Sequence, residues 1–229
     1  MYIPFDEKEW PDSWKIVEFK EYPRLLKIPL PEPSGLDGEL REILIKRRSI
    51  RNFDSNASIS SDKLSSLLFW SAGISRNKQD PEKSFRFYPS GGARYSLEIY
   101  FYFRGNDQIP PGLYHYNVKN HYLEKILGEE VKREIVSLPT YTFARDAALF
   151  FFVTGIFDRH MRKYRERGYR FGLIEQGLLL ENFYLVSAAL DLGCCGIGSI
   201  FDTEIENILD INPPDEAFIG SFVVGPTKT

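Results

Sequence analysis

The sequence has 229 residues, of which 43% are hydrophobic and 27% charged, a composition typical of a folded globular chain and not of a disordered one. Its net charge of −3 at pH 7 gives no general attraction to nucleic acid or to an anionic membrane surface, so neither is expected as a partner. The start of the chain does not resemble a secretory signal, and no apolar stretch of membrane-spanning length is free of charges, so a cytoplasmic protein is expected.

An N-terminal arm is predicted for residues 1–36, which are rich in proline and aromatic residues and show no helical or strand periodicity. We expect this arm to lie across the surface of a single larger domain formed by residues 37–229. That domain should begin with a helix from about Asp37, in which apolar residues recur at helical spacing, and which ends at the sequence RRSIRNF, residues 47–53.

A second helix is predicted from a cap at Ser60 or Ser61 to about Gly73, with leucines spaced as a core-facing stripe. The next segments, in chain order, are predicted as a strand over 97–103, a hairpin over 112–117 and 121–123, a helix over 128–138, and an apolar strand covered on both faces over 147–154.

A long helix is predicted from about Arg170 to Leu192, with Gly193 as its C-cap, after a basic helical segment over 158–169. Because the long helix is apolar nearly all round, it should be buried in the domain centre or in a subunit interface. The rest of the sequence predicts a strand over 194–200, a helix over 202–209 capped by Asp202, and a last strand over 217–225. The order of elements indicates an α+β fold.

Three arginines stand within five residues of the RRSIRNF segment, at Arg47, Arg48 and Arg51, with Ser49 between them. The backbone at a helix C-terminus repels anions, so only the side chains could bind one, and their forked donors suit a phosphate monoester. Taken alone, the heptapeptide favours a solvated basic helix end over a binding site.

Two further segments carry candidate chemistry. The sequence YPSGGARY, residues 88–95, has two glycines that allow close backbone approach to a flat ligand, although alone it describes a tight turn more often. Lys163 precedes Tyr164, and an ammonium can lower the pKa of a neighbouring phenol, so the pair could relay protons. The glycine-dense segment 193–198 follows a helix and lacks the spacing of a dinucleotide-binding fingerprint.

No metal site is predicted. The only cysteines, Cys194 and Cys195, are adjacent, so they cannot form a disulfide framework or a four-thiolate site, and small buried side chains are expected. The three histidines, His115, His121 and His160, lack the paired spacing of zinc ligands.

Taken together, these segments resemble the nitroreductase superfamily of FMN enzymes and, within it, the SagB-type azoline dehydrogenases. The resemblance covers residues 28–225, through IPLPEP, RRSIRNF, YPSGGARYSLEIY, PGLYHYNVKNHYLE, the stretch from KYRERGYRF to GSIFD, and VVG. It implies a central, mostly antiparallel sheet flanked by helices. It also implies a homodimer that binds FMN between its subunits, with the long helix at the dimer interface.

The resemblance also implies roles for individual residues. The arginine segment would hold the FMN phosphate and ribityl chain, the PSGG loop would lie against the flavin, and a glycine-rich segment would offer backbone amides near flavin N5. A basic residue close to the C-terminus would complete the phosphate site, and a Lys-Tyr pair would take part in catalysis. The matching residues are Arg47, Arg48, Ser49 and Arg51; Pro89, Ser90, Gly91 and Gly92; Gly196, Ile197, Gly198 and Ser199; Lys228; and Lys163 with Tyr164.

The reaction implied is oxidation of a thiazoline or oxazoline in a modified peptide to the azole. Three positions depart from the family pattern: Leu178 stands where a histidine is usual, Glu181 where a glutamine is usual, and Ser96 where a proline is frequent. These departures leave open an NAD(P)H-dependent nitro or quinone reductase on the same fold. A non-catalytic flavin-binding subunit of a biosynthetic complex, and a chance arginine cluster that binds no flavin, remain further alternatives.

Overall fold

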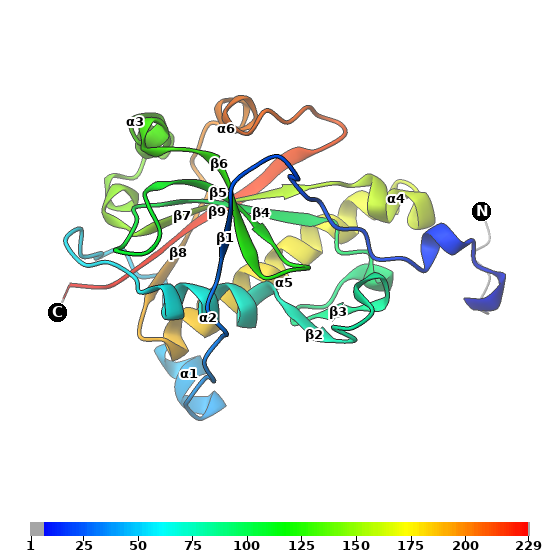
Figure 1. Ribbon diagram of the computed structural model, residues 1–229, viewed down its shortest axis with the longest axis horizontal. Helices are drawn as coiled ribbons and strands as arrows, with labels where there is room; N and C mark the ends of the chain where they lie inside the picture. The colour runs from blue at the N-terminus through cyan, green and yellow to red at the C-terminus, as the bar shows by residue number, and fades with distance from the viewer. Residues whose placement is uncertain (1–6, 229) are drawn as a thin grey trace.

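The centre of the molecule is a seven-stranded sheet in which every pair of neighbouring strands is antiparallel (Figure 1). The computed structural model describes residues 7–228, so residues 1–6 of the predicted arm and Thr229 at the end of the predicted domain lie outside the described residues. The strands are β1 (Lys27–Pro29), β4 (Leu97–Phe103), β5 (Gly112–Asn117), β6 (Tyr122–Leu127), β7 (Leu149–Gly155), β8 (Gly193–Ile197) and β9 (Ala217–Gly225), in the spatial order β1-β6-β5-β4-β7-β9-β8.

The two middle strands, β4 and β7, are buried along their whole length. Phe101 on β4 lies opposite Phe151 on β7, and the Phe151 ring stacks on Phe222 of β9 with centroids 4.5 Å apart. Aromatic side chains remove large apolar areas from water, which makes this aromatic layer a main source of stability. The prediction of a strand covered on both faces is confirmed.

Helices cover both faces of the sheet (Figure 1). The long helix α5 and the helix α2 pack on one face, with α1 beside the end of α5, while α3 and α6 pack on the other. A two-stranded hairpin, β2 with β3, lies beside the sheet. These elements are α1 (Leu40–Lys46), α2 (Ser61–Ala72), α3 (Lys132–Ser137), α4 (Asp158–Tyr164), α5 (Arg167–Ala189), α6 (Asp202–Leu209), β2 (Ile74–Arg76) and β3 (Phe85–Arg86).

Helix α2 agrees with its prediction at both ends. The Ser60 side chain accepts a hydrogen bond from the backbone N–H of Lys63, as an N-cap does, and Gly73 follows the last turn. The leucines of its apolar stripe, Leu64, Leu67 and Leu68, have no exposed surface.

Helix α5 differs from its prediction in its bounds and its burial. It begins at Arg167 and ends at Ala189, so Gly193 is not its C-cap but the first residue of β8. Only one face of the helix is buried within the chain, and apolar side chains on the other face are exposed, by 41% at Leu173 and 53% at Ile174. The placement of this helix at a dimer interface stays a prediction.

Two smaller predictions also need correction. Asp202 is the first helical residue of α6 and not its cap, a position taken by Phe201, which makes no capping hydrogen bond through its side chain. The helix predicted over 128–138 is shorter: a 3-10 turn over Glu129–Val131 precedes α3.

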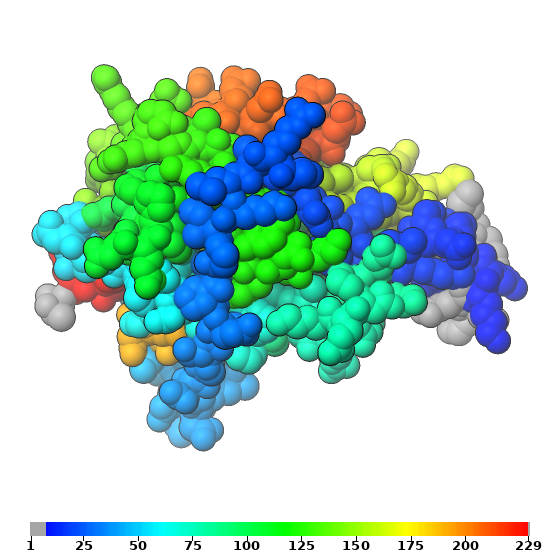
Figure 2. Space-filling model, in the orientation of Figure 1, coloured from blue at the N-terminus to red at the C-terminus, as the bar shows by residue number. Residues whose placement is uncertain are grey.

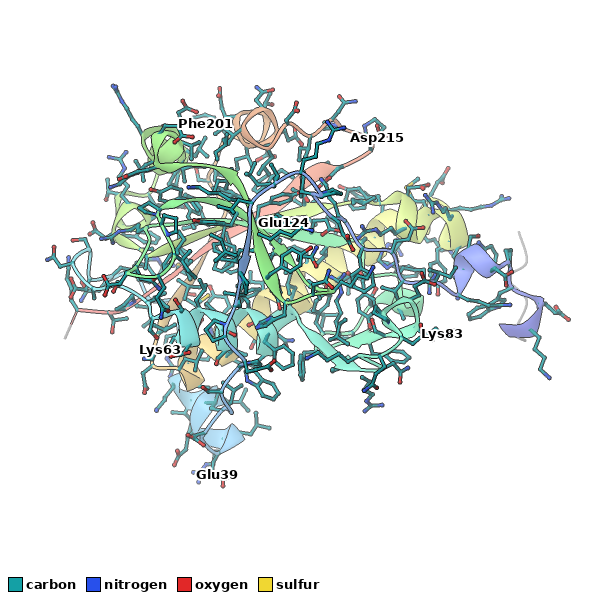
Figure 3. All side chains as sticks on the ribbon, viewed as in Figure 1. Glu39, Lys63, Lys83, Glu124, Phe201 and Asp215 are labelled. Atoms are coloured by element: carbon teal, nitrogen blue, oxygen red, sulfur yellow. The ribbon has the colours of Figure 1, made fainter. Side chains whose placement is uncertain are left out.

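The described part of the arm contains two single-turn helices, Glu7–Glu9 and Asp12–Trp14, and the strand β1, which the sequence did not predict. This segment crosses the face of the molecule in Figure 2. The backbone N–H of Tyr22 donates to the carboxylate of Glu124, which Figure 3 labels near the centre of the molecule. β1 lies within the predicted arm but pairs with β6 of the central sheet. The boundary at residue 36 between an arm and a domain therefore stays a prediction.

Candidate functional site

The candidate residues form two groups at opposite ends of α5. The arginine segment and Gly196 of β8 both contact Tyr184 in the C-terminal half of α5, and β8 then leads on to Ser199, whose carbonyl accepts from the Thr140 N–H. We call the arginine segment and residues 196–199 the arginine group. The loop 89–92 and the pair Lys163–Tyr164 lie near its N-terminal end, beside α4, and we call them the loop group. Figure 1 shows α1 and α4 at these separate places. Glu175 and Tyr184, which contact the two groups, are nine residue steps apart on the helix, a distance of about 14 Å along its axis.

The arginine group is built on the edge strand β8. The C-cap of α1 is Arg47, after which the chain turns along β8: Ser49 forms a parallel bridge with Cys194, and the Ile50 N–H donates to the Cys194 carbonyl at 3.0 Å. This pairing places the arginine segment directly beside the segment that leads to Gly196.

Tyr184 of α5 joins the two parts of the arginine group. Its hydroxyl is 3.1 Å from Ser49 Oγ and accepts a 2.8 Å hydrogen bond from the Gly196 N–H. The Arg47 guanidinium carbon lies 5.6 Å from the centroid of the same ring. Tyr184 was not among the residues predicted from the sequence. The only local signal for it was a phenol within an otherwise apolar helix, next to the buried Phe183.

The charge of the arginine group is open to an anion. Arg48 and Arg51 are exposed, and they donate hydrogen bonds to the backbone carbonyls of Arg47 and Ser49 respectively. Within residues 7–228, none of the three arginines forms an ion pair with a carboxylate. Lys228 lies nearby, its N–H donating to the Asn52 carbonyl, but its ammonium is 3.7 Å from an Asp146 carboxylate oxygen.

The loop group is attached to α5 through a buried polar triangle. The Ser90 hydroxyl donates to Glu175 Oε2 at 2.7 Å, and His160 Nε2 lies 3.3 Å from both of these oxygens. The Tyr95 N–H donates to the same Ser90 oxygen at 2.9 Å. His160 and Glu175 are 0% and 1% exposed, so the triangle is shielded from solvent beneath the loop.

The catalytic pair expected from the sequence lies directly against the loop. Gly92 has φ +65°, and a Cβ at this position would stand 2.3 Å from the Tyr164 hydroxyl and 3.3 Å from Lys163 Nζ. Only glycine fits both the backbone conformation and this space. The Tyr164 ring meets Phe171 of α5 edge to face, with centroids 4.9 Å apart.

A tight turn between α4 and α5 makes this arrangement possible. Arg165 has φ +53° and ends α4, and the Gly168 N–H donates back to its carbonyl. A Cβ at Gly168 would lie 2.7 Å from the Met161 nitrogen, so the close crossing of the two helices requires glycine there. The crossing brings Tyr164 back over the first turns of α5.

Burial determines the protonation chemistry of the loop group. It raises the pKa of Glu175 to about 7 and lowers the pKa of His160 to about 4, the latter with help from the Arg94 and Arg159 charges. Burial also raises the pKa of Tyr164, and the opposing influence comes from Arg94. The expectation of a lowered pKa for this phenol is therefore wrong, because desolvation outweighs the charge of Arg94.

The basic segment before α5 faces inward at three positions. Arg159, His160 and Lys163 are buried. The Arg159 guanidinium lies 2.6 Å from a Glu98 carboxylate oxygen, and Glu98 in turn contacts His115 at 3.0 Å. Arg162, by contrast, is half-exposed and forms an ion pair with Glu18.

Sequence reasoning missed Glu175, His160 and Arg94 as members of the loop group. Arg94 is 6% exposed and donates to the Gly92 carbonyl at 2.8 Å. The available signal was a single carboxylate, Glu175, at the spacing of the buried positions on an otherwise apolar helix face.

The side chains of the arginine group and the backbone of the loop group have the chemistry needed to bind the phosphate and the ring of FMN. The exposed guanidinium groups around Ser49 suit a phosphate, and Pro89 and Gly92 are exposed on a loop with little side-chain bulk, which suits a flat ring.

Cys194 and Cys195 are buried free thiols. In the described part of the chain, no group of three or more His, Cys, Asp or Glu side chains could hold a metal ion. No helix there has the length and hydropathy to cross a bilayer.

Comparisons with known proteins place this chain among nitroreductases. A family model described as "Nitroreductase family" matches residues 44–226. The Methanocaldococcus jannaschii protein named "Putative nitroreductase MJ1384" is 33% identical over 187 residues, which cover 81% of this chain and 90% of that protein. The trifolitoxin-processing protein TfxB of Rhizobium leguminosarum bv. trifolii is 33% identical over 144 residues, which cover 59% of this chain but only 38% of TfxB.

Two solved structures share the fold. A crystal structure described as a "putative nitroreductase from anabaena variabilis" superposes with a TM-score of 0.77 and 27% identity, covering 93% of this chain and 44% of that chain. A "putative nitroreductase in complex with FMN" from Exiguobacterium sibiricum has a TM-score of 0.60 at 15% identity, covering 85% of this chain and 91% of that one. At 15% sequence identity, the similarity to the Exiguobacterium sibiricum structure shows a shared fold only.

Proposed function

We propose that this chain, a member of the nitroreductase family, is an FMN-dependent oxidoreductase and acts as a SagB-type dehydrogenase on a thiazoline or oxazoline ring in a modified peptide. The observation that carries this proposal is the contact of Lys163 and Tyr164 with Gly92 of the PSGG loop. The similarity to TfxB, a trifolitoxin-processing protein, supports a peptide-derived substrate.

The arginine group would bind the cofactor phosphate and ribityl chain through Arg47, Arg48, Ser49 and Arg51. Charge-assisted hydrogen bonds from forked guanidinium groups suit this task, and Lys228 would add a further positive charge. The backbone of Pro89, Ser90, Gly91 and Gly92 would support the flavin ring, and Gly196, Ile197, Gly198 and Ser199 would provide backbone amides near its N5.

Bound FMN supplies the acceptor for the two electrons removed from the substrate. Conversion of an azoline to an azole releases one hydride and one proton from the ring. The chain's own contribution is to hold the ring and to take the proton, through Lys163 or Tyr164. Since burial raises the pKa of Tyr164, its hydroxyl is protonated at neutral pH and suits hydrogen-bond donation, which leaves Lys163 as the candidate base.

We further propose that the protein is a homodimer that contacts its second copy along α5. The exposed apolar residues Leu173, Ile174 and Leu178 lie on the outer face of that helix, and Leu40 and Leu44 are exposed on α1 beside its end. A monomer would leave this apolar surface in water. A dimer of this kind would also bring arginine and loop groups from different subunits together around one FMN.

A second candidate is an NAD(P)H-dependent nitro or quinone reductase. It is favoured by the match to MJ1384, which extends over 90% of that protein. Such an enzyme needs no base for a ring proton, so the two functions differ in what they require of Lys163 and Tyr164.

The test compares Lys163→Met and Tyr164→Phe with the wild type on two reactions. One is oxidation of a short synthetic peptide that carries one thiazoline, and the other is reduction of nitrofurazone by NADH. The dehydrogenase proposal expects the variants to lose thiazoline oxidation while the flavin spectrum is retained. If the wild type reduces nitrofurazone but never oxidises the thiazoline, and the variants are equally active, the reductase is the correct function.

A further inference from the structure

A small cavity lies on the face of the sheet that α3 covers, opposite α5 (Figure 1). Tyr102 of β4 and Phe150 of β7, which are paired across the sheet, line it from the sheet side. Ile135 and Val136 of α3 add apolar walls. The cavity holds about 170 Å³. One water takes up about 30 Å³ and sites for drug-sized ligands hold about 300–1,000 Å³, so the size suits a small molecule.

The hydroxyl of Tyr102 lacks a hydrogen-bond partner. Tyr102 is 2% exposed, and its buried hydroxyl forms no hydrogen bond with any residue that the structure describes. A buried polar group is destabilising unless a partner bonds it. Burial, together with the Glu129 carboxylate, raises the pKa of Tyr102 to about 12, so the hydroxyl keeps its proton at neutral pH. It is therefore a donor that calls for an acceptor in the cavity.

Three positively charged side chains line the same cavity, those of Arg104, Lys132 and Arg145. Within residues 7–228, none of the three forms an ion pair with a carboxylate. Arg104 is half-buried and donates to the backbone carbonyls of Asp146 and Ser55, which uses two of the five guanidinium N–H donors. The cavity therefore offers positive charge and unused donors to an anion.

The walls restrict the kind of anion. A phosphate needs donors around all of its oxygens, whereas Val136 and Phe150 offer none through their side chains. A neutral apolar molecule would leave the Tyr102 hydroxyl without an acceptor. A carboxylate on a compact apolar body satisfies both parts of the cavity, because its oxygens accept charge-assisted hydrogen bonds and its body contacts the apolar walls.

We propose that this cavity is a binding site for a small carboxylic acid with a compact apolar body, separate from the proposed flavin site. The carboxylate accepts hydrogen bonds from Tyr102 and Arg104, and Lys132 and Arg145 attract it from the rim. Arg104 also holds the turn at Ser55, two residues after the end of the arginine segment, so the site borders the arginine group. The proposal rests on neither the dehydrogenase function nor the flavin.

The first experiment tests for binding. The probe is para-fluorobenzoate, whose binding to the full-length protein is followed by fluorine NMR. We expect saturable binding by the wild type, and binding of para-fluorobenzamide that is roughly tenfold weaker or less, because the amide has the same shape without the charge. Tyr102→Phe, which removes only the hydroxyl, should weaken benzoate binding several-fold. A wild type that does not bind the acid, or that binds acid and amide equally, would overturn the proposal.

The second experiment locates the bound acid by changing charge at the rim. Lys132→Met with Arg145→Met removes two exposed cations that line the cavity, and Arg24→Met with Arg133→Met removes two exposed cations that do not. We expect the first pair to weaken binding roughly tenfold or more and the second to leave it unchanged. Equal losses in both pairs would mean that the acid responds only to net charge, and the site would be rejected.

A third variant fills the cavity. Val136→Phe adds a ring to the half-buried wall and should abolish binding of para-fluorobenzoate, while an unchanged circular dichroism spectrum shows that the fold is intact. If this variant and the variant with Lys132→Met and Arg145→Met both bind the acid as tightly as the wild type, the acid occupies another place, such as the proposed flavin site. That result would overturn the assignment of the cavity.

Discussion

The Ser90 hydroxyl donates a 2.7 Å hydrogen bond to the Glu175 carboxylate, and this bond attaches the loop before β4 to the buried face of α5. The proposed flavin loop is thus positioned by a helix whose opposite face is the proposed dimer contact. His160 of α4, 3.3 Å from the same carboxylate oxygen, adds the helix that carries Lys163 and Tyr164. Three parts of the proposed site therefore depend on one buried carboxyl group.

Glu175→Gln should remove a pH-dependent loss of stability. Burial raises the pKa of Glu175 from 4.5 to about 7, so the folded state holds a proton that the unfolded chain releases between these pH values. The wild type therefore loses up to about 3 kcal/mol as pH rises from 4.5 to 7, and the loss is complete above pH 7. We expect the variant to be as stable as the wild type at pH 4.5 and more stable at pH 8.

Urea unfolding of both proteins at several pH values measures this difference. His160, whose pKa is lowered to about 4, contributes with the opposite sign, losing stability as pH falls from 6.5 towards 4, but it is present in both proteins. Glu181→Gln, on the exposed side of the same helix, is the control. A constant difference between wild type and Glu175→Gln at every pH would contradict the prediction.

Gly92→Ala should displace Tyr164 from the loop. The added Cβ would lie 2.3 Å from the Tyr164 hydroxyl, and the φ of +65° costs a non-glycine residue about 1–2 kcal/mol. We expect a lower melting temperature and a loss of thiazoline oxidation.

Thermal unfolding monitored by circular dichroism is the measurement. Combining Gly92→Ala with Tyr164→Phe removes the clashing oxygen and should recover part of the stability. Gly35→Ala, where the structure has open space around the Cβ, should change neither property. Full wild-type behaviour of the single variant Gly92→Ala would show that the loop and Tyr164 are not in contact.

Arg47→Ala with Arg51→Ala should weaken FMN binding far more than riboflavin binding. Riboflavin lacks the phosphate, so it reports on the rest of the site. Each charge-assisted hydrogen bond contributes about 1.5–3 kcal/mol, so losing one from each arginine should weaken FMN binding roughly a hundredfold to ten-thousandfold.

Isothermal titration of the apoprotein with each flavin gives the two affinities. Arg41→Ala, on the exposed side of α1, is the control for the loss of positive charge. An equal loss of FMN and riboflavin affinity would mean that the arginines support the fold and do not bind the phosphate. An absence of flavin binding in the wild type would reject the cofactor assignment for this chain.

Ile174→Lys should produce a monomer. Ile174 is 53% exposed on the outer face of α5, and a lysine there would place a charge in the middle of the proposed contact. Light scattering after size-exclusion chromatography is the measurement, and we expect FMN to be lost together with the second subunit. Leu26→Lys, at an exposed apolar residue of the arm, should remain dimeric. A wild type that runs as a monomer would reject the dimer.

Local patterns in the sequence determined most of the elements of this protein. Alternating or continuous apolar residues predicted β4 and β7, a serine cap and a leucine stripe predicted α2, and the arginine segment was found at the end of its helix. These features depend on residues that are close in the chain, because helix periodicity, strand propensity and capping are short-range effects.

Only the tertiary structure decided which distant groups meet. The contacts of Glu175 with Ser90 and of Trp10 with Lys163 join residues 85 and more than 150 positions apart, and no local pattern predicts such pairs. The direction of the Tyr164 pKa was also decided there, because burial depends on the packing around the phenol and not on the identity of the residue beside it. Chain neighbours determined the elements, and long-range packing determined the site.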